Sequence, residues 1–378
     1  MVFNLRTSSF TESDEDDPTP PKTFSLKELR VATHDFSSNN IVGQYWDAVV
    51  YRGRLANGSL VAVKRAHCVD PQKKEEFEAA MKVGSTISRH PNVLCLRGFC
   101  RTKKELLLVY PLMVNNSLSY HLRERPDRFA RPLDWTTRKR IALGAARGLA
   151  HLHNQGNIKV LHRDIRSYNI LLNEHFEAVI GGFALAMIMH EGNVETVEWR
   201  TGSADSGSDS PSYQPYEDVY VESTVRGVLG FIAPEYFWTG KCTLKNDVFA
   251  YGKMLLELIS GKSVQKPFSS ADGENLTFME WIGGFLNENE LGRVIDPNLQ
   301  GNCVEEEAAQ LIRLALSCAH EDPSVRLEMP GVVGMLKSQF LQQDPSSRSS
   351  WSQSEYDSTP YYSFPPSPSP PSPQGIAR

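Results

Sequence analysis

The chain has 378 residues, of which 22% are charged and 40% hydrophobic, and its net charge is −5; these values are ordinary for a globular protein and give no reason to propose nucleic-acid binding. Its six cysteines lack C-x-x-C spacing, which argues against a zinc site or a disulfide framework and favours free thiols in a reducing cytosol. The N-terminus has no signal-peptide core, Val2 excludes N-myristoylation, and no apolar run approaches the roughly 20 residues that span a bilayer, so we expect no direct membrane insertion.

The first part of the chain predicts a disordered leader and then strands. Residues 1–22 are acidic and contain prolines, with little to drive burial. Residues 41–64 alternate Gly/Asn turns with Val- and Tyr-rich runs, and Asn57-Gly58 predicts a hairpin between two strands. A helix over 72–89 and a buried strand over Lys104–Met113 are expected next.

The rest of the chain predicts helices and then a polar tail. Apolar residues recur at helical spacing over 138–153 and 308–318. Residues 247–261 are apolar nearly all round, as in a central buried helix, with Gly261 as its stop. The Ser/Pro-rich tail, 341–378, is expected to be disordered. We prefer a solvated spacer there; the alternative is a phosphorylated or polyproline II docking segment, since three of its serines precede prolines: Ser367, Ser369 and Ser372.

Five stretches in fixed order resemble the plant receptor-like kinases. They are "FSLKELRVATHDFSSNNIVG", "VAVKR", "HRDIRSYNILL", "IAPEYFWTGK" and "DVFAYGKMLLELISG". The stretch "LDWTTRKRIALGAARGLAHLH" is similar to the cytoplasmic domain of the leucine-rich-repeat somatic embryogenesis receptor kinases. The resemblance covers residues 24–340 and implies an α+β, two-lobed protein-kinase fold. The small β-rich N-lobe would be 23–111 and the larger helical C-lobe 112–340.

The resemblance implies a nucleotide site that is degenerate at the phosphates. Gly43 matches the first glycine of the Gly-rich loop, but Tyr45 and Ala48 stand where the second and third are expected. Trp46 adds bulk, so we prefer a plain hairpin turn with aromatic cover to a phosphate cradle. The positions that would surround adenine are Val50, Ala62, Tyr110 as gatekeeper and Met113 at the hinge.

Lys64 matches the lysine that contacts the α- and β-phosphates and needs a glutamate on the next helix. Counting along that helix puts the partner at Ala80 or Met81, neither of which is acidic. Glu78 is near in sequence but is expected on another face. Lys64 therefore either meets a phosphate or extends to solvent without a partner.

The catalytic loop is better preserved. His162, Arg163 and Asp164 match His-Arg-Asp, and Asn169 matches the metal-binding asparagine. Arg166 replaces the family's lysine, which keeps the charge but loses a compact donor. The loop also has a structural role, so its retention alone does not imply activity.

The metal position is lost. The stretch "GFA" stands where Asp-Phe-Gly is expected, and Gly182 has no side chain to hold Mg²⁺. Asn169 alone is a poor magnesium site, because Mg²⁺ usually takes a carboxylate together with phosphates. Ala184 also replaces the glycine that lets this segment flip.

The following segment departs from the family, whereas the structural anchors are kept. Residues 189–223 form an extended acidic activation loop, expected to be disordered, with phosphorylatable docking as the alternative. Val228 replaces the threonine that helps to position a Ser/Thr substrate. The resemblance implies that Glu235 pairs with Arg326 in a buried pair, and that Asp247 caps the catalytic-loop backbone.

We therefore expect an inactive kinase, or pseudokinase, that scaffolds or allosterically regulates active receptor-like kinases in cell-surface receptor signalling. It would lie in the cytoplasm, at the inner face of the plasma membrane through a partner. One alternative is a weak Ser/Thr kinase that uses Lys64, Asp164 and Asn169. The other alternative is a switch that binds ATP without turnover. In both the pseudokinase and the switch, we expect Mg²⁺ binding to be lost.

Overall fold

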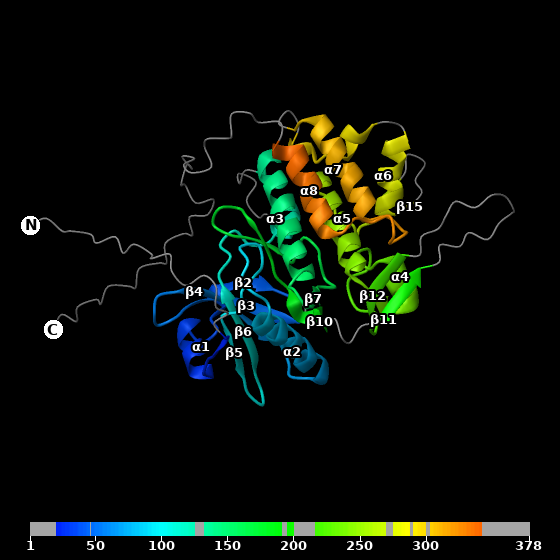
Figure 1. Cartoon of the computed structure of the whole chain (residues 1–378). Coiled ribbons are helices and arrows are strands. Elements are labelled where there is room, and N and C mark those ends of the chain that lie inside the picture. Colours follow the sequence, from blue (N-terminus) through cyan, green and yellow to red (C-terminus); the bar gives the residue numbers. More distant parts are fainter. Residues whose placement is uncertain are drawn as a thin grey trace, which may run out of the picture.

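The computed structural model describes residues 20–45, 47–124, 132–190, 195–199, 216–269, 275–287, 290–299 and 303–341. A β-sheet lobe and a helical lobe lie side by side, as the two-lobed α+β prediction requires (Figure 1). Residues 1–19 and 342–378 lie outside the described residues, so the predicted disorder of both ends stays a prediction. Lys22, which the sequence analysis assigned to the disordered leader, belongs to a strand. Among the described residues, no helix is both long and apolar enough to cross a bilayer.

The small lobe is a six-stranded sheet in the order β1-β5-β6-β4-β3-β2, antiparallel except where β1 pairs with β5. Its strands are β1 (Lys22–Thr23), β2 (Ile41–Gln44), β3 (Ala48–Arg54), β4 (Leu60–Ala66), β5 (Gly98–Arg101) and β6 (Leu106–Pro111). The hairpin predicted at Asn57-Gly58 is confirmed: it joins β3 to β4, and Gly58 has φ +86°, a conformation that favours glycine.

Two helices and a short 3₁₀ turn accompany this sheet. They are α1 (Leu26–Ala32), η1 (Ser38–Asn40) and α2 (Pro71–Thr86). Helix α2 confirms the helix predicted over 72–89, although it ends three residues earlier. The Asp70 side chain accepts from the Lys73 backbone and Pro71 opens the first turn, where its missing N–H costs nothing.

Strand alternation decides which side chains of the small lobe face the cleft. Leu107 and Val109 of β6 pack with Val61 and Val63 of β4 in one core cluster. The neighbouring positions of the same two strands, among them Ala62 and Lys64 of β4, face the cleft instead, because successive side chains of a strand point to opposite faces.

The large lobe is helical (Figure 1). Its helices are η2 (Tyr120–Glu124), α3 (Trp135–His153), η3 (Phe183–Leu185), α4 (Pro234–Thr239), α5 (Leu244–Ser260), α6 (Phe278–Asn287), η4 (Leu291–Val294), η5 (Pro297–Leu299), α7 (Glu305–Cys318) and α8 (Met329–Leu341). Short strands connect them: β7 (Ile158–Leu161), β8 (Ile170–Leu172), β9 (Ala178–Ile180), β10 (Met187–His190), β11 (Glu195–Trp199), β12 (Tyr216–Glu222), β13 (Lys241–Cys242), β14 (Phe268–Ser269) and β15 (Asn275–Leu276).

Helix α5 confirms the predicted central buried helix, because every residue from Lys245 to Ser260 is buried. Thr243 and Asn246 form a capping box at its start. Gly261 ends it in the left-handed conformation, at φ +68°, as predicted.

The segment 189–223 differs in part from the predicted disordered loop. Strands β11 and β12 lie within it and pair antiparallel, and β12 continues the sheet onto β13. Both strands are rich in β-branched and aromatic residues, which favour strands, despite the acidic residues between them. The prediction of disorder is therefore wrong for β11 and β12, whereas 191–194 and 200–215 lie outside the described residues.

Candidate active site

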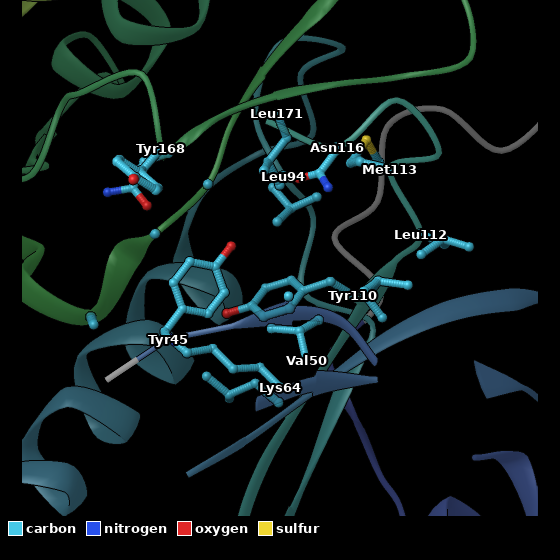
Figure 2. A pocket seen from close by; sticks show the side chains of 18 of the residues that line it. Tyr45, Val50, Lys64, Leu94, Tyr110, Leu112, Met113, Asn116, Tyr168 and Leu171 are labelled. Carbon is cyan, nitrogen blue, oxygen red and sulfur yellow. The ribbon is translucent and has the colours of Figure 1, made fainter. Parts of the chain in front are cut away.

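A cavity of about 1320 Å³ lies between the two lobes. One wall comes from the sheet, with Val50 of β3 and Lys64 of β4, and the cavity is also lined by Asp164 and Asn169. Figure 2 shows Val50 and Lys64 on the sheet, with the rings of Tyr45 and Tyr110 above them. The structure thus brings the predicted nucleotide-binding and catalytic positions into one cleft.

The hinge side of the cleft is largely apolar. Ala62 and Tyr110 are cross-strand neighbours of β4 and β6, and Met113 follows directly after β6. Leu94 and Leu171, which the sequence analysis did not select, also line this part of the cavity (Figure 2). Burial raises the pKa of the Tyr110 phenol, so the ring stays neutral. A flat aromatic ring such as adenine suits such a surface.

The side chain of Tyr45 fills the space inside the Gly-rich turn. A Cβ placed on Gly43 would lie 3.0 Å from Cε2 of Tyr45, so the phenol ring packs directly against this glycine. Tyr45 lines the cavity, and burial, followed by the nearby charge of Glu124, raises the pKa of its phenol. Ala48 is buried in β3, and Trp46 lies outside the described residues. The ring of Tyr45 therefore occupies space that a phosphate cradle leaves open.

Lys64 has a partner that the sequence analysis missed. Its Nζ lies 3.9 Å from Oδ2 of Asp47, in the Gly-rich turn. Of the two alternatives for Lys64, the lysine without a partner is therefore wrong, because the Gly-rich turn brings Asp47 to β4. Ala80 lines the cavity without an acidic group, as expected.

The acidic side chains of α2 are engaged elsewhere. Glu78 pairs with Arg101 at the surface, as the sequence predicted when it placed Glu78 on another face. Glu76 lines the cavity but its Oε2 lies 2.7 Å from Nζ of Lys73, one turn back along the helix. Met81 is only partly buried and packs against the main core.

The carboxylate of Asp164 is held on both sides. Arg166 donates from Nε to Oδ1 at 2.9 Å, and Asn169 donates from Nδ2 to Oδ2 at 2.7 Å. Asn169 also donates to the Asp164 carbonyl oxygen at 2.7 Å. Both oxygens of this carboxylate thus accept hydrogen bonds within the loop. Each carboxylate oxygen has a second lone pair, so these bonds position Asp164 without preventing it from accepting a proton.

Gly182 and Asn169 share the place expected for the metal-binding carboxylate. Gly182 has φ +86°, and a Cβ there would lie 2.3–2.7 Å from the amide atoms of Asn169. The Asn169 side chain thus fills the space in which an aspartate at position 182 would begin. In the part of the chain that the structure describes, no three His, Cys, Asp or Glu side chains cluster as metal ligands. The residues present do not fit Mg²⁺, which needs oxygen ligands that include a carboxylate.

The frame beneath the catalytic loop has the contacts expected from the sequence. Asp247 accepts from the backbone N–H groups of His162 and Arg163 at 2.7 and 2.8 Å, and from His153 Nε2 at 3.0 Å. His162 bonds the Gly181 carbonyl at 2.8 Å, and Arg163 holds a left-handed φ of +64°. Burial alone would raise the pKa of Asp247, but its hydrogen bonds with His153 and His162 hold that pKa below the usual value.

A second anchor joins the first turn of α4 to the turn before α8. Arg326 donates from Nη1 and Nη2 to the two carboxylate oxygens of Glu235, at 2.6 and 2.8 Å. Both side chains are buried, and Asn246 donates to the same carboxylate at 2.6 Å. This is the pair expected from the sequence. Val228 lines the outer part of the cavity, and an aliphatic side chain there offers no hydroxyl to the catalytic loop.

Comparison with known proteins agrees with this geometry. A family model for the protein kinase domain matches residues 36–354. A probable LRR receptor-like serine/threonine-protein kinase of Arabidopsis thaliana is 39% identical over 322 residues, which are 85% of this chain and 48% of the relative. The LRR receptor kinase SERK2 of Oryza sativa subsp. japonica is 36% identical over 336 residues, which are 88% of this chain and 50% of the relative. The chain therefore spans about half the length of these curated relatives.

Proposed function

The chain belongs to the protein kinase family and is homologous to plant LRR receptor-like serine/threonine kinases, and from this premise we propose that it is an inactive member, a pseudokinase. It acts as a scaffold or allosteric regulator of active receptor-like kinases in cell-surface receptor signalling. Its place is the cytoplasm, at the inner face of the plasma membrane through such a partner.

The observation that carries the proposal is the loss of the metal position at Gly182. Gly182 has no carboxylate, and the Asn169 amide fills the space beside it where the metal ligand is expected. Metal stabilisation of the transferring charge contributes several kcal/mol in phosphoryl transfer. Because each 1.36 kcal/mol corresponds to a factor of ten, its loss lowers the rate by about a thousandfold or more.

Phosphoryl transfer by the purified protein is the direct test. Radiolabelled ATP is supplied with Mg²⁺ or Mn²⁺, and autophosphorylation and transfer to a basic substrate are measured beside an Asp164→Asn control. We expect the same incorporation in the protein and in the control. Incorporation that disappears in the control contradicts the proposal.

The regulatory role needs its own test. The cytoplasmic domain of an active LRR receptor kinase is assayed for substrate phosphorylation with and without this protein. A change in rate that saturates with concentration supports regulation, and binding without a change supports a scaffold. Absence of both binding and a rate change overturns the role, whatever the result of the first assay.

A weak serine/threonine kinase is the second candidate, favoured by the intact frame of the catalytic loop. Asp247 holds the backbone of His162 and Arg163, so Asp164 stands at the position that a general base requires. Such a kinase would use a free lone pair of Asp164 while Arg166 and Asn169 hold the carboxylate in place. The radiolabel assay separates this candidate from the preferred one.

A further inference from the structure

Helix α4, in the large lobe, carries an exposed aromatic pair (Figure 1). Phe237 and Trp238 are adjacent in the sequence and are 47% and 80% exposed. Their ring centroids lie 5.0 Å apart and the ring planes make an angle of 87°. The two rings therefore meet at a right angle at the surface, with most of the indole open to solvent.

Two more exposed apolar residues lie next to this pair. Val325 and Leu327 flank Arg326 in the turn before α8 and are 48% and 37% exposed. Arg326 pairs with Glu235 of α4, so the buried ion pair holds this turn against the helix. We call these four apolar residues the α4 patch. A group of exposed apolar side chains, unlike a single one, is typical of an interaction site.

The chemistry of the α4 patch suits a proline-rich segment. A polyproline II helix has no internal hydrogen bonds, so its carbonyl oxygens remain free to accept, and its proline rings pack on aromatic side chains. The indole N–H of Trp238 is a donor, and within the described residues it has no hydrogen-bond partner. The patch thus offers apolar ring faces and one donor, as the grooves that bind Pro-x-x-Pro segments do.

The chain itself contains such a segment. Residues 365–373 read "PPSPSPPSP" and lie outside the described residues. Pro-x-x-Pro occurs three times in this tract, at 365–368, 368–371 and 370–373. The tract has no charged residue, so docking on an apolar patch buries no charge.

The tract can reach the α4 patch from the end of α8. Helix α8 starts three residues after Arg326 and, with 13 residues, is about 20 Å long. With the turn, the Arg326–Glu235 pair and one turn of α4 added end to end, the path from Leu341 to Trp238 is about 50 Å. The 23 residues 342–364 can span about 75 Å when fully extended. The tether therefore allows the contact within one chain.

We propose that the tract 365–373 docks on the α4 patch of the same chain as a polyproline II helix, with Phe237 and Trp238 as its main contacts. The tether raises the local concentration of the tract to the order of millimolar, so a weak contact is enough to keep the patch covered. The patch lies outside the cleft, so the docking does not depend on whether phosphate is transferred.

The indole N–H signals in the NMR spectrum of the ¹⁵N-labelled whole chain test the contact. Trp238→Phe identifies the signal of Trp238. Replacing Pro368 and Pro370 by alanine interrupts all three Pro-x-x-Pro repeats, and we expect the Trp238 signal to shift toward that of a free indole. The matched control replaces Pro345 and Pro360, two prolines of the tail outside the tract, and should leave the signal in place.

A synthetic peptide of residues 363–374 provides a second measurement. In the Pro368→Ala/Pro370→Ala chain the patch is vacant, and the peptide should return the Trp238 signal to its original position. In the unmodified chain the tethered tract competes, so we expect the peptide to bind about tenfold more weakly there. Equal affinity in the two chains would overturn the proposal.

Dilution distinguishes the tail of the same chain from that of a second copy. A contact within one chain does not depend on protein concentration, so the Trp238 signal should not move on dilution. A signal that moves shows that the tail docks on another copy and overturns the internal contact. A Trp238 signal that the Pro368→Ala/Pro370→Ala change leaves in place, or that both double variants shift equally, would overturn the docking itself.

Discussion

The contact between Gly182 and Asn169 predicts a strong coupling between these two positions. In Gly182→Ala the new Cβ collides with the Asn169 amide, which must rotate and give up its bonds to the Asp164 carboxylate and carbonyl. A bond to a charged group contributes about 1.5–3 kcal/mol and a neutral bond about 0.5–1.5 kcal/mol. A non-glycine residue at φ +86° adds about 1–2 kcal/mol. We expect Gly182→Ala to lower the free energy of unfolding by about 3–6.5 kcal/mol, the sum of these values.

A double-mutant cycle isolates the collision from the backbone strain. In an Asn169→Ala background the amide is already gone, and Gly182→Ala should cost about 1–2 kcal/mol, the strain alone. The two substitutions should therefore couple by about 2–4.5 kcal/mol. Guanidinium denaturation followed by circular dichroism measures all four proteins. Additive effects within about 0.5 kcal/mol would refute the reasoning, because they mean that Asn169 does not occupy the space beside Gly182.

Three other predictions concern the metal position, the buried anchor and a histidine pair. Gly182→Asp should not restore radiolabel transfer in Mg²⁺, because its Cβ displaces the Asn169 amide, the second metal ligand that the site would need; incorporation above that of Asp164→Asn contradicts this. Arg326→Met should lower the free energy of unfolding in guanidinium by about 3–5 kcal/mol, because it leaves the Glu235 carboxylate buried without its partner. Arg293→Met, at the exposed pair with Glu290, should lower it by less than about 1 kcal/mol. Equal decreases in the two variants would contradict the structural role of the buried pair. Burial, with the charges of His151 and Arg147, lowers the pKa of His90 from 6.5 to about 4. The unfolded chain therefore binds a proton at His90 before the folded chain does, and the free energy of unfolding should fall as the pH drops from 6.5 to about 4. His90→Asn should make this pH dependence shallower, and an unchanged pH dependence would contradict its assignment to His90.

The elements were predictable because local chemistry and periodicity agree. Asn57-Gly58 specifies a tight turn whatever its surroundings, and Gly261 ends α5 by the same preference for a left-handed φ. The strand pairing of β11 and β12 was not predicted. The many acidic residues of this segment indicate disorder, whereas the β-branched and aromatic residues beside them favour strands.

The network around Lys64 could not be found by counting along one helix. Asp47 reaches Lys64 from a turn that is 17 residues earlier in the sequence, and only the fold of the Gly-rich turn brings them together. Glu76, an acidic residue one turn before Ala80, could have been predicted as a partner for Lys64. It pairs with Lys73 instead, which depends on side-chain geometry. The hydrogen bond from Arg166 to Asp164 could not be predicted from the sequence either. The sequence shows the charge of Arg166, but only the structure shows the direction of its side chain.

The retained kinase motifs of this chain, His-Arg-Asp and Ala-Pro-Glu, indicate its fold more than its catalytic activity. Glu235, Arg326 and Asp247 are buried and charged, so replacing any of them costs several kcal/mol whether or not phosphate is transferred. The residues that face the cleft carry no such penalty, because their polar groups reach solvent when a partner is lost. A chain that stops transferring phosphate therefore keeps His-Arg-Asp and Ala-Pro-Glu for stability while its cleft residues change. The position that discriminates between a kinase and a binding module is Gly182, where the Asn169 amide fills the space that a metal-binding carboxylate needs.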